Sequence, residues 1–217
     1  MLRSPADSTL YDQEWKDFLA TQDFGQLIAF GVARRHPIVT PSHYIFDGKN
    51  NVELHLHRAN PFFKAIAESP YVTFSVIAAH TYIPTYWNND PNSDPSWAVP
   101  TSYYAAVQAS GSATTIDTDS ALADLLNRQM LRFQPEGKHH PVQPGDNPFG
   151  RMLAAIRGVR VAIQTVDAKF KFGGNRDPEH RLQIAERLAS RSAPRDSEAR
   201  SLLLHRHAIV ERRTDSN

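Results

Sequence analysis

Two short segments of this chain gather the side chains that could bind an anion. The first, residues 169–181, contains two lysines, two arginines and a histidine, and a Gly173-Gly174 pair precedes Asp177-Pro178. An aspartate followed by a proline is typical of a helix start, because the carboxylate accepts free N–H groups and proline has no N–H to leave unpaired. Cations beside a helix start suit a phosphate. The alternative is an ordinary turn with solvated charges.

The second segment, residues 54–61, places His55, Arg58 and Asn60 where an expected strand runs into another helix start. These side chains and the free N–H groups could converge on one phosphate. In the alternative, Asn60 only caps the helix and Arg58 is only solvated. His55 and His57 also form a His-x-His pair on one strand face, but a third ligand at useful spacing is missing, so we expect no metal site.

Residues that could hold a planar ligand lie elsewhere in the chain. Thr40, Ser42 and His43 are on an expected strand, where they could reach the edge of a heteroaromatic ring or be ordinary strand residues. The proline-rich segment 81–100 has four aromatic residues, which could stack on a planar ligand, cover a barrel end or form a subunit contact. P-loop, dinucleotide, nucleophile-elbow and helix-turn-helix motifs are absent from the sequence. The pattern favours binding a phosphorylated planar cofactor over chemistry by the chain's own side chains.

Length and composition narrow the class of protein. The 217 residues fit one main domain, which we expect over residues 1–191, followed by a polar C-terminal tail over 192–217. The formal charge of +1 argues against a dedicated DNA-wrapping or membrane-surface protein, and the absence of cysteine excludes disulfides and thiolate metal sites. No segment has the length of a membrane span or the pattern of a signal peptide, so we expect a cytoplasmic protein.

The elements expected to position these groups are strands with short helices around them. Alternating and β-branched residues predict strands over residues 27–32, 37–46, 52–57, 71–79, 103–115 and 159–166. Caps and apolar spacing predict helices over residues 12–24, 61–68, 118–133, 148–157 and 178–191. We expect loops over 81–100 and 134–145, and a frayed end at 215–217. Six mostly antiparallel strands with peripheral helices predict a small barrel of the α+β class.

Several short motifs occur in a fixed order between about Asp12 and Ala189. They are Phe24-Gly25, His55 with Asn60-Pro61, Tyr82-Ile83 with Trp87, Val99-Pro100-Thr101 with Tyr104 and Gly111, and Lys169-Phe170-Lys171 with Asn175-Arg176 and Arg181. Together, their order and spacing resemble those of the PaiB-type proteins, described as FMN-binding negative transcriptional regulators. These belong to the wider group of flavin-binding split β-barrels.

The resemblance implies a mainly β, α+β fold: a six-stranded antiparallel Greek-key split β-barrel of the FMN-binding type with peripheral helices. It implies a homodimer that holds FMN in the groove between subunits. The implied function is a transcriptional regulator or redox sensor; the alternative is a flavin- or haem-dependent oxidoreductase of the pyridoxamine-phosphate-oxidase type. The regulator label makes DNA a candidate partner, although residues 175–217, with nine arginines and seven acidic residues, form no strong electrostatic footprint for it.

The resemblance also assigns cofactor-binding roles to nine positions, while catalytic residues stay unknown. The assignments are Thr40 near the isoalloxazine ring; His55, Arg58 and Asn60 on the phosphate side; Trp87 and Tyr104 lining or covering the ring; and Lys171, Asn175 and Arg176 closing the site. The chain departs from the family at Thr40-Pro41-Ser42-His43, where a Thr-His-Leu-Pro run is usual.

Overall fold

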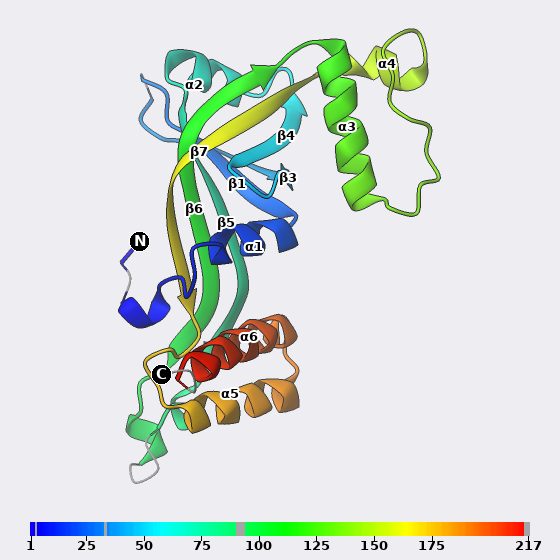
Figure 1. Ribbon diagram of the computed structural model, residues 1–217. Helices are drawn as coiled ribbons and strands as arrows, with labels where there is room; N and C mark the ends of the chain where they lie inside the picture. The colour runs from blue at the N-terminus through cyan, green and yellow to red at the C-terminus, as the bar shows by residue number, and fades with distance from the viewer. Residues whose placement is uncertain (3, 33, 90–93, 215–217) are drawn as a thin grey trace. The chain divides into compact units, whose positions relative to one another are not determined.

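The computed structural model describes residues 1–2, 4–32, 34–89 and 94–214 (Figure 1). The chain forms two compact units. Unit 1 consists of Met1–Trp15, Ile77–Val107 and Asp167–Asn217, and unit 2 of Lys16–Val76 and Gln108–Val166. Three long strands, β5 (Tyr71–Ile83), β6 (Thr101–Ile116) and β7 (Ile156–Lys171), contribute residues to both units. The expected frayed end at 215–217 lies outside the described residues.

The strands form a mainly antiparallel sheet of seven strands, with helices around it. Besides the long strands β5, β6 and β7, the sheet contains β1 (Phe24–Ala29), β2 (Ile38–His43), β3 (Ile45–Phe46) and β4 (Asn51–His57). Within the described residues the hydrogen-bonded order is β2-β1-β5-β6-β7-β4-β3, and the terminal strands β2 and β3 do not pair with each other. The predicted six-stranded barrel is therefore wrong in strand number and in closure: the sheet is open and has seven strands.

The additional strand arises because Tyr44 divides the segment predicted as one strand. Its side chain is 1% exposed, and its hydroxyl donates to the Leu19 carbonyl at 2.8 Å. Its backbone N–H donates to the Asp23 carbonyl at 3.1 Å instead of to a neighbouring strand. The ladder is thus interrupted between β2 and β3, although the apolar pattern continues through both.

Unit 2 has its apolar core between the sheet and helices α2 (Phe62–Glu68) and α3 (Asp119–Phe133). On β4, Val52 pairs with Val161 and Leu54 with Val159 of β7, and all four side chains are buried. Such apolar cross-strand pairs stabilise a sheet and fix its register. The remaining helices of this part are most of α1 (Glu14–Thr21) and the short α4 (Pro148–Leu153), which ends earlier than predicted.

Unit 1 contains the antiparallel helices α5 (Pro178–Arg191) and α6 (Asp196–Thr214), which lie side by side (Figure 1). The α5 start is as predicted, with the Asp177 carboxylate accepting the His180 N–H at 2.8 Å. The segment expected to be a polar tail contains α6. Its buried positions include Asp196 and Arg206 as well as Ala199 and Leu203, which weakens the apolar periodicity that would have indicated a helix. The domain boundary at residue 191 stays a prediction.

Two strands are longer than predicted, and their additional C-terminal residues belong to unit 1. β5 continues to Ile83 and β7 to Lys171, which places Lys171 at the last position of its strand. The expected loop after β5 contains two short 3-10 helices, η2 (Thr85–Trp87) and η3 (Pro95–Trp97). Residues 90–93 of that loop are outside the described part of the chain.

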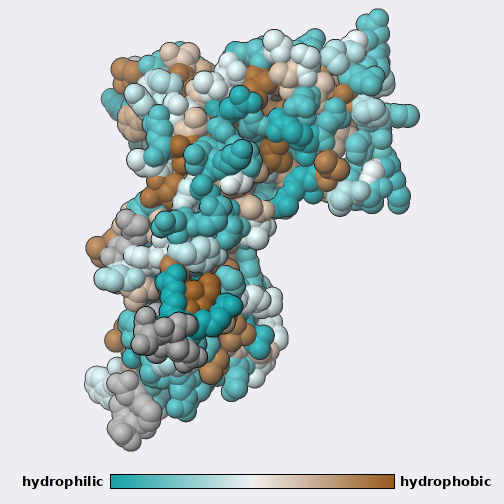
Figure 2. Space-filling view, viewed as in Figure 1, coloured by the Kyte–Doolittle hydropathy of each residue, from teal (hydrophilic) through white to brown (hydrophobic). Residues whose placement is uncertain are grey.

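The surface mixes polar and apolar residues. On the face seen in Figure 2, hydrophobic residues stand in small groups between hydrophilic ones. Among the described helices, none combines the length and apolar character needed to cross a bilayer.

Candidate functional site

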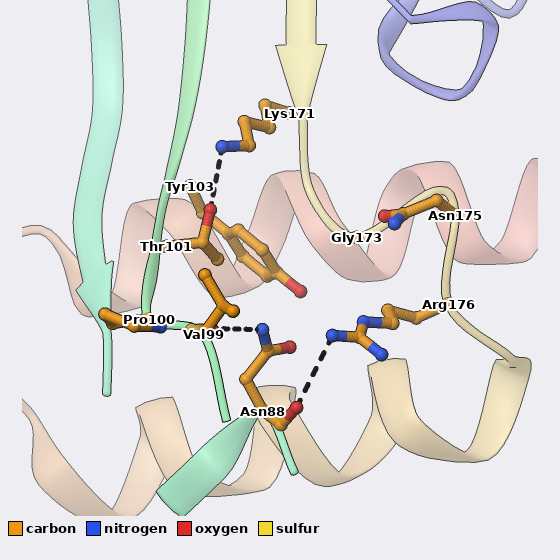
Figure 3. Close-up of a pocket in the computed structure, with 9 residues that line it drawn as sticks. All are labelled: Asn88, Val99, Pro100, Thr101, Tyr103, Lys171, Gly173, Asn175 and Arg176. Carbon is orange, nitrogen blue, oxygen red and sulfur yellow. Dashed lines mark hydrogen bonds between the residues drawn. The ribbon is translucent and has the colours of Figure 1, made fainter. Parts of the chain in front are cut away.

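A pocket in unit 1 brings together three of the residues predicted to bind the cofactor, Lys171, Asn175 and Arg176 (Figure 3). We call it the cationic pocket. Its volume is about 250 Å³. The remaining lining residues come from β6, from the turn after β7 and from the loop before β6: Asn88, Val99, Pro100, Thr101, Tyr103 and Gly173.

The turn between β7 and α5 shapes one wall of the cationic pocket. Gly173 has a φ of +70°, in the left-handed region that favours glycine, and the Arg176 N–H closes the turn by donating to the Gly173 carbonyl at 2.9 Å. A Cβ atom on Gly173 would lie 2.3 Å from the Tyr103 hydroxyl oxygen. Glycine is therefore required here for two reasons, the backbone angle and the close approach of the phenol.

Two cationic side chains reach the pocket from different elements. Lys171 Nζ donates to Thr101 Oγ1 at 2.7 Å, and Arg176 Nη2 donates to the Asn88 carbonyl at 3.4 Å (Figure 3). Asn88 is itself fixed by a 2.6 Å bond from its side-chain amide to the Val99 carbonyl. Among the described residues that line the pocket, none is acidic. The pocket therefore has a net positive character and suits an anion.

Tyr103 adds an unused hydrogen-bond donor to this pocket. Its side chain is 2% exposed, and within the described residues its hydroxyl has no hydrogen-bond partner. Burial raises the pKa of Tyr103 to about 12, although Arg176 and Arg181 act in the opposite direction. The phenol is therefore neutral and can donate. A buried hydroxyl without a partner costs about 1–3 kcal/mol, so a bound acceptor would recover that energy.

Tyr103 was not among the predicted residues, whereas its neighbour Tyr104 was. Consecutive residues of a strand point to opposite faces of the sheet, so only one of the two can line the cationic pocket. Tyr104 is half-buried and has Lys169 Nζ at 5.8 Å from its ring centroid. The signal that could have identified Tyr103 is its two-residue spacing from Thr101, which lines the same pocket.

Trp87, the other residue expected to cover the ring, is also outside the lining of the cationic pocket. Its indole lies beneath Arg191, whose Cζ is 4.5 Å from the ring centroid. Arg191 in turn forms an ion pair with Asp196 at 2.7 Å and donates to the Thr81 hydroxyl at 2.7 Å. In this arrangement Trp87 covers a structural ion pair of unit 1.

The residues predicted on the phosphate side lie in unit 2, where Arg58 and Asn60 have hydrogen-bond partners within that unit. Arg58 Nε donates to the Ala154 carbonyl at 3.0 Å, and its Nη2 donates to the Ile156 carbonyl at 3.1 Å. Asn60 Oδ1 accepts the Phe62 N–H at 2.9 Å in the first turn of α2. These contacts agree with the capping alternative for Asn60; the phosphate-side roles of both residues stay predictions.

Thr40 and His55 are also in unit 2. Thr40 is half-buried on β2, opposite Leu27 of β1. His55 is on β4 and lines a second cavity, of about 520 Å³, together with His43. The described part of the chain contains no group of three or more His, Cys, Asp or Glu side chains that could hold a metal ion.

Comparison with known proteins identifies relatives over most of the chain. Residues 4–165 match the family described as "Putative FMN-binding domain". The protein called "Protease synthase and sporulation protein PAI 2" of Bacillus subtilis (strain 168) is 22% identical over 204 residues, which cover 88% of this chain and 90% of that protein.

Two solved structures share the fold. The FAD and haem binding protein of Mycobacterium smegmatis has a TM-score of 0.59 and 19% identity, over 80% of this chain and 78% of that one. The flavocytochrome Anf3 of Azotobacter vinelandii has a TM-score of 0.58 and 18% identity, over 75% of this chain and 69% of that one. At these identities the likeness establishes the fold alone.

Proposed function

This chain belongs to the "Putative FMN-binding domain" family and is of the PaiB type, and from that premise we propose that it binds FMN through the cationic pocket. We further propose that it acts as a flavin-responsive transcriptional regulator or redox sensor, the function associated with the PaiB-type motifs. Of the residues that line the cationic pocket, Thr101 and Tyr103 lie within the matched range 4–165, and Lys171 and Arg176 lie shortly after the end of that range.

The observation that carries the proposal is the donor set of the cationic pocket. A phosphate monoester has several oxygen acceptors and nearly two negative charges. Lys171 has an ammonium group with three donors, Arg176 has a guanidinium with five, and the Tyr103 hydroxyl has no partner among the described residues. Charge-assisted bonds from lysine and arginine to phosphate are among the strongest in proteins.

The volume of the cationic pocket limits which part of FMN it can enclose. At about 250 Å³ it is smaller than the ~300–1,000 Å³ typical of pockets that bury a whole drug-sized ligand. We therefore assign it to the phosphate and the adjoining sugar-alcohol chain. Val99, which lines the pocket and is 72% exposed, offers apolar surface next to it. A second copy of the chain, in a homodimer, would complete the wall around the ring.

Bound FMN would supply reversible electron transfer, and the pocket residues would bind and orient it. Lys171, Asn175 and Arg176 were predicted to close the cofactor site; we propose instead that they bind the phosphate end, together with Tyr103. The roles predicted for Thr40, His55, Arg58, Asn60, Trp87 and Tyr104 stay predictions, because these residues lie outside the lining of the cationic pocket.

Titration of the protein with FMN and with riboflavin tests this assignment, because riboflavin lacks only the phosphate. We expect FMN fluorescence to be quenched at micromolar protein, and riboflavin to bind about ten- to a hundredfold more weakly, the effect of losing a charge-assisted bond. The Lys171→Met and Arg176→Gln variants should lose FMN affinity and keep the weaker riboflavin affinity. Equal affinities for the two flavins, or no binding of either, contradict the proposal.

A flavin-dependent oxidoreductase is the second candidate, because such an enzyme needs a substrate pocket beside the ring and the aromatic residues of segment 81–100 could provide it. Aerobic turnover of NAD(P)H by the flavin-loaded protein would support it, and an inert flavin would contradict it. A DNA-binding regulator instead requires a salt-dependent mobility shift on a defined operator.

A further inference from the structure

The cavity in unit 2 has a composition unlike that of the cationic pocket. Its lining residues come from β1, β2, β4 and α3 and the residue after it, and among those described none is Lys, Arg, Asp or Glu. We call it the aromatic cavity. Its volume of about 520 Å³ falls within the ~300–1,000 Å³ of small-molecule pockets. A neutral ligand suits such a lining, since a charged one would be desolvated without an opposite charge to pair with.

Aromatic rings form one wall of the aromatic cavity. The His43 ring meets Phe24 edge-on, with centroids 5.0 Å apart, and lies 5.1 Å from the Phe133 centroid at an angle of 50°. Phe24 and Phe133 are 50% and 37% exposed, so both retain uncovered ring surface. Rings in edge or tilted contact readily take up a further planar ring, because their quadrupoles favour such offset arrangements.

One face of helix α3 supplies another part of this lining, and Phe133 belongs both to this face and to the aromatic wall. This face begins at Leu126 and continues three, four and seven residues later with Gln129, Met130 and Phe133. Residues at these spacings lie on one side of a helix. Leu126 and Met130 also pack against a buried core cluster, which fixes this wall. Gln129 is the polar member of the group and is 5% exposed.

The two histidines of the aromatic cavity present the same kind of hydrogen-bonding atom. His43 Nδ1 lies 3.1 Å from the Asp23 carbonyl, and His55 Nδ1 lies 2.7 Å from Gln129 Oε1. Both partners are oxygens that only accept, so each Nδ1 carries the proton. In a neutral imidazole the other nitrogen, Nε2, then has a free lone pair and acts as an acceptor.

From these features we propose that the aromatic cavity is a second ligand site, independent of the cationic pocket. Its ligand is a small neutral planar molecule with an N–H or O–H group on the ring, such as an indole or a phenol. The ring packs between the aromatic wall and the α3 face, and the N–H or O–H donates to Nε2 of His43 or His55.

Indole and 1-methylindole are the probes that test this, because they differ only in the ring N–H. We expect indole to bind, measured by isothermal titration calorimetry, about three- to tenfold more tightly than 1-methylindole, as for one neutral hydrogen bond. His43→Phe keeps an aromatic ring, and the Asp23 carbonyl keeps the Tyr44 N–H as a donor. This variant should reduce or abolish the preference for indole while 1-methylindole binds as before. The matched control, His36→Phe, replaces an exposed histidine outside the cavity and should change neither affinity.

Three outcomes would overturn the assignment. The first is equal binding of the two probes, or binding of neither. The second is displacement of indole by FMN, which would make the cavity part of the flavin site; persistence of indole binding at saturating FMN supports independence. The third is a nitrogen-15 NMR spectrum that places the protons of both imidazoles on Nε2. Because the probes carry no phosphate, failure here leaves the comparison of FMN with riboflavin at the cationic pocket unaffected.

Discussion

The hydroxyl oxygen of Tyr103 lies 2.3 Å from the point that a Cβ atom on Gly173 would occupy. Tyr103 belongs to β6, and Gly173 to the turn between β7 and α5. The phenol can reach the cationic pocket only because the turn has no side chain at this position. The donor set proposed for the phosphate therefore depends on this pair.

Gly173→Ala should lower both stability and FMN affinity. The methyl group would collide with the Tyr103 hydroxyl, and a non-glycine residue at a φ of +70° costs a further ~1–2 kcal/mol. Gly48→Ala is a matched control, because Gly48 has a φ of +74° and open space around its Cβ position. Chemical denaturation should show a clearly larger loss for Gly173→Ala; equal losses would mean that the collision is relieved without cost.

Tyr103→Phe should separate stability from binding. It removes the buried hydroxyl that has no partner among the described residues and keeps the ring, so the free energy of unfolding should stay the same or rise by up to about 1–3 kcal/mol. FMN affinity should fall about three- to tenfold, as for one lost hydrogen bond, while riboflavin affinity is unchanged. Fluorescence titration and thermal denaturation measure the two effects. A loss of stability without a change in FMN affinity would contradict the donor role.

Arg58→Ala should act on stability. The Arg58 guanidinium donates to the Ala154 and Ile156 carbonyls, and its loss should lower the free energy of unfolding by about 1 kcal/mol. Arg58→Lys should restore part of this loss, because one ammonium group can reach one of the carbonyls. Urea denaturation measures both variants. Unchanged stability with reduced FMN affinity would instead assign Arg58 to the phosphate, as its sequence context predicts.

Ser192→Gly should stabilise the protein. Ser192 follows the last residue of α5 with a φ of +48°, a left-handed conformation in which glycine avoids the clash of a side chain. We expect a gain of about 1 kcal/mol by chemical denaturation. Ser190→Gly, two residues earlier in the same helix, is the control and should destabilise by about 0.5–1 kcal/mol. A loss of stability in Ser192→Gly would show that its hydroxyl bond to the Ala189 carbonyl matters more than the backbone angle.

The Arg191–Asp196 pair should make stability depend on acidic pH. Hydrogen bonds, the strongest from Arg191, lower the pKa of Asp196 from 3.8 to about 2 in the folded state. A carboxylate whose pKa is lowered by folding contributes its full stabilisation to the folded state when the pH is above its pKa in the unfolded state. This contribution, about 2 kcal/mol, is lost as the pH falls from about 5 to 2.

The Asp196→Asn variant has no carboxylate to titrate at this position. Its free energy of unfolding should therefore fall less than that of the unmodified chain between these two pH values, as measured by urea denaturation. Parallel pH profiles for the two proteins would contradict the assignment.

Most local elements, and the family, could be predicted from the amino-acid sequence alone. Caps such as Asp177 and strand alternation such as that of Val52 and Leu54 depend on neighbouring residues, so they can be read along the chain. The same holds for the ordered motifs that indicated the FMN-binding family, and for Lys171, Asn175 and Arg176, which are close in sequence and meet in one pocket.

Which distant residues share a site depends on how the elements pack in three dimensions, and this could not be predicted from the sequence. Tyr103 reaches the cationic pocket and Tyr104 does not, because strand register sets which face each side chain takes. His43 and His55 meet through the packing of β2, β4 and α3, and Arg58 is held by carbonyls almost a hundred residues away. The interruption at Tyr44 and the polar helix α6 depend on buried hydrogen bonds and ion pairs between distant segments. The periodicity of apolar residues along the chain does not reveal such contacts.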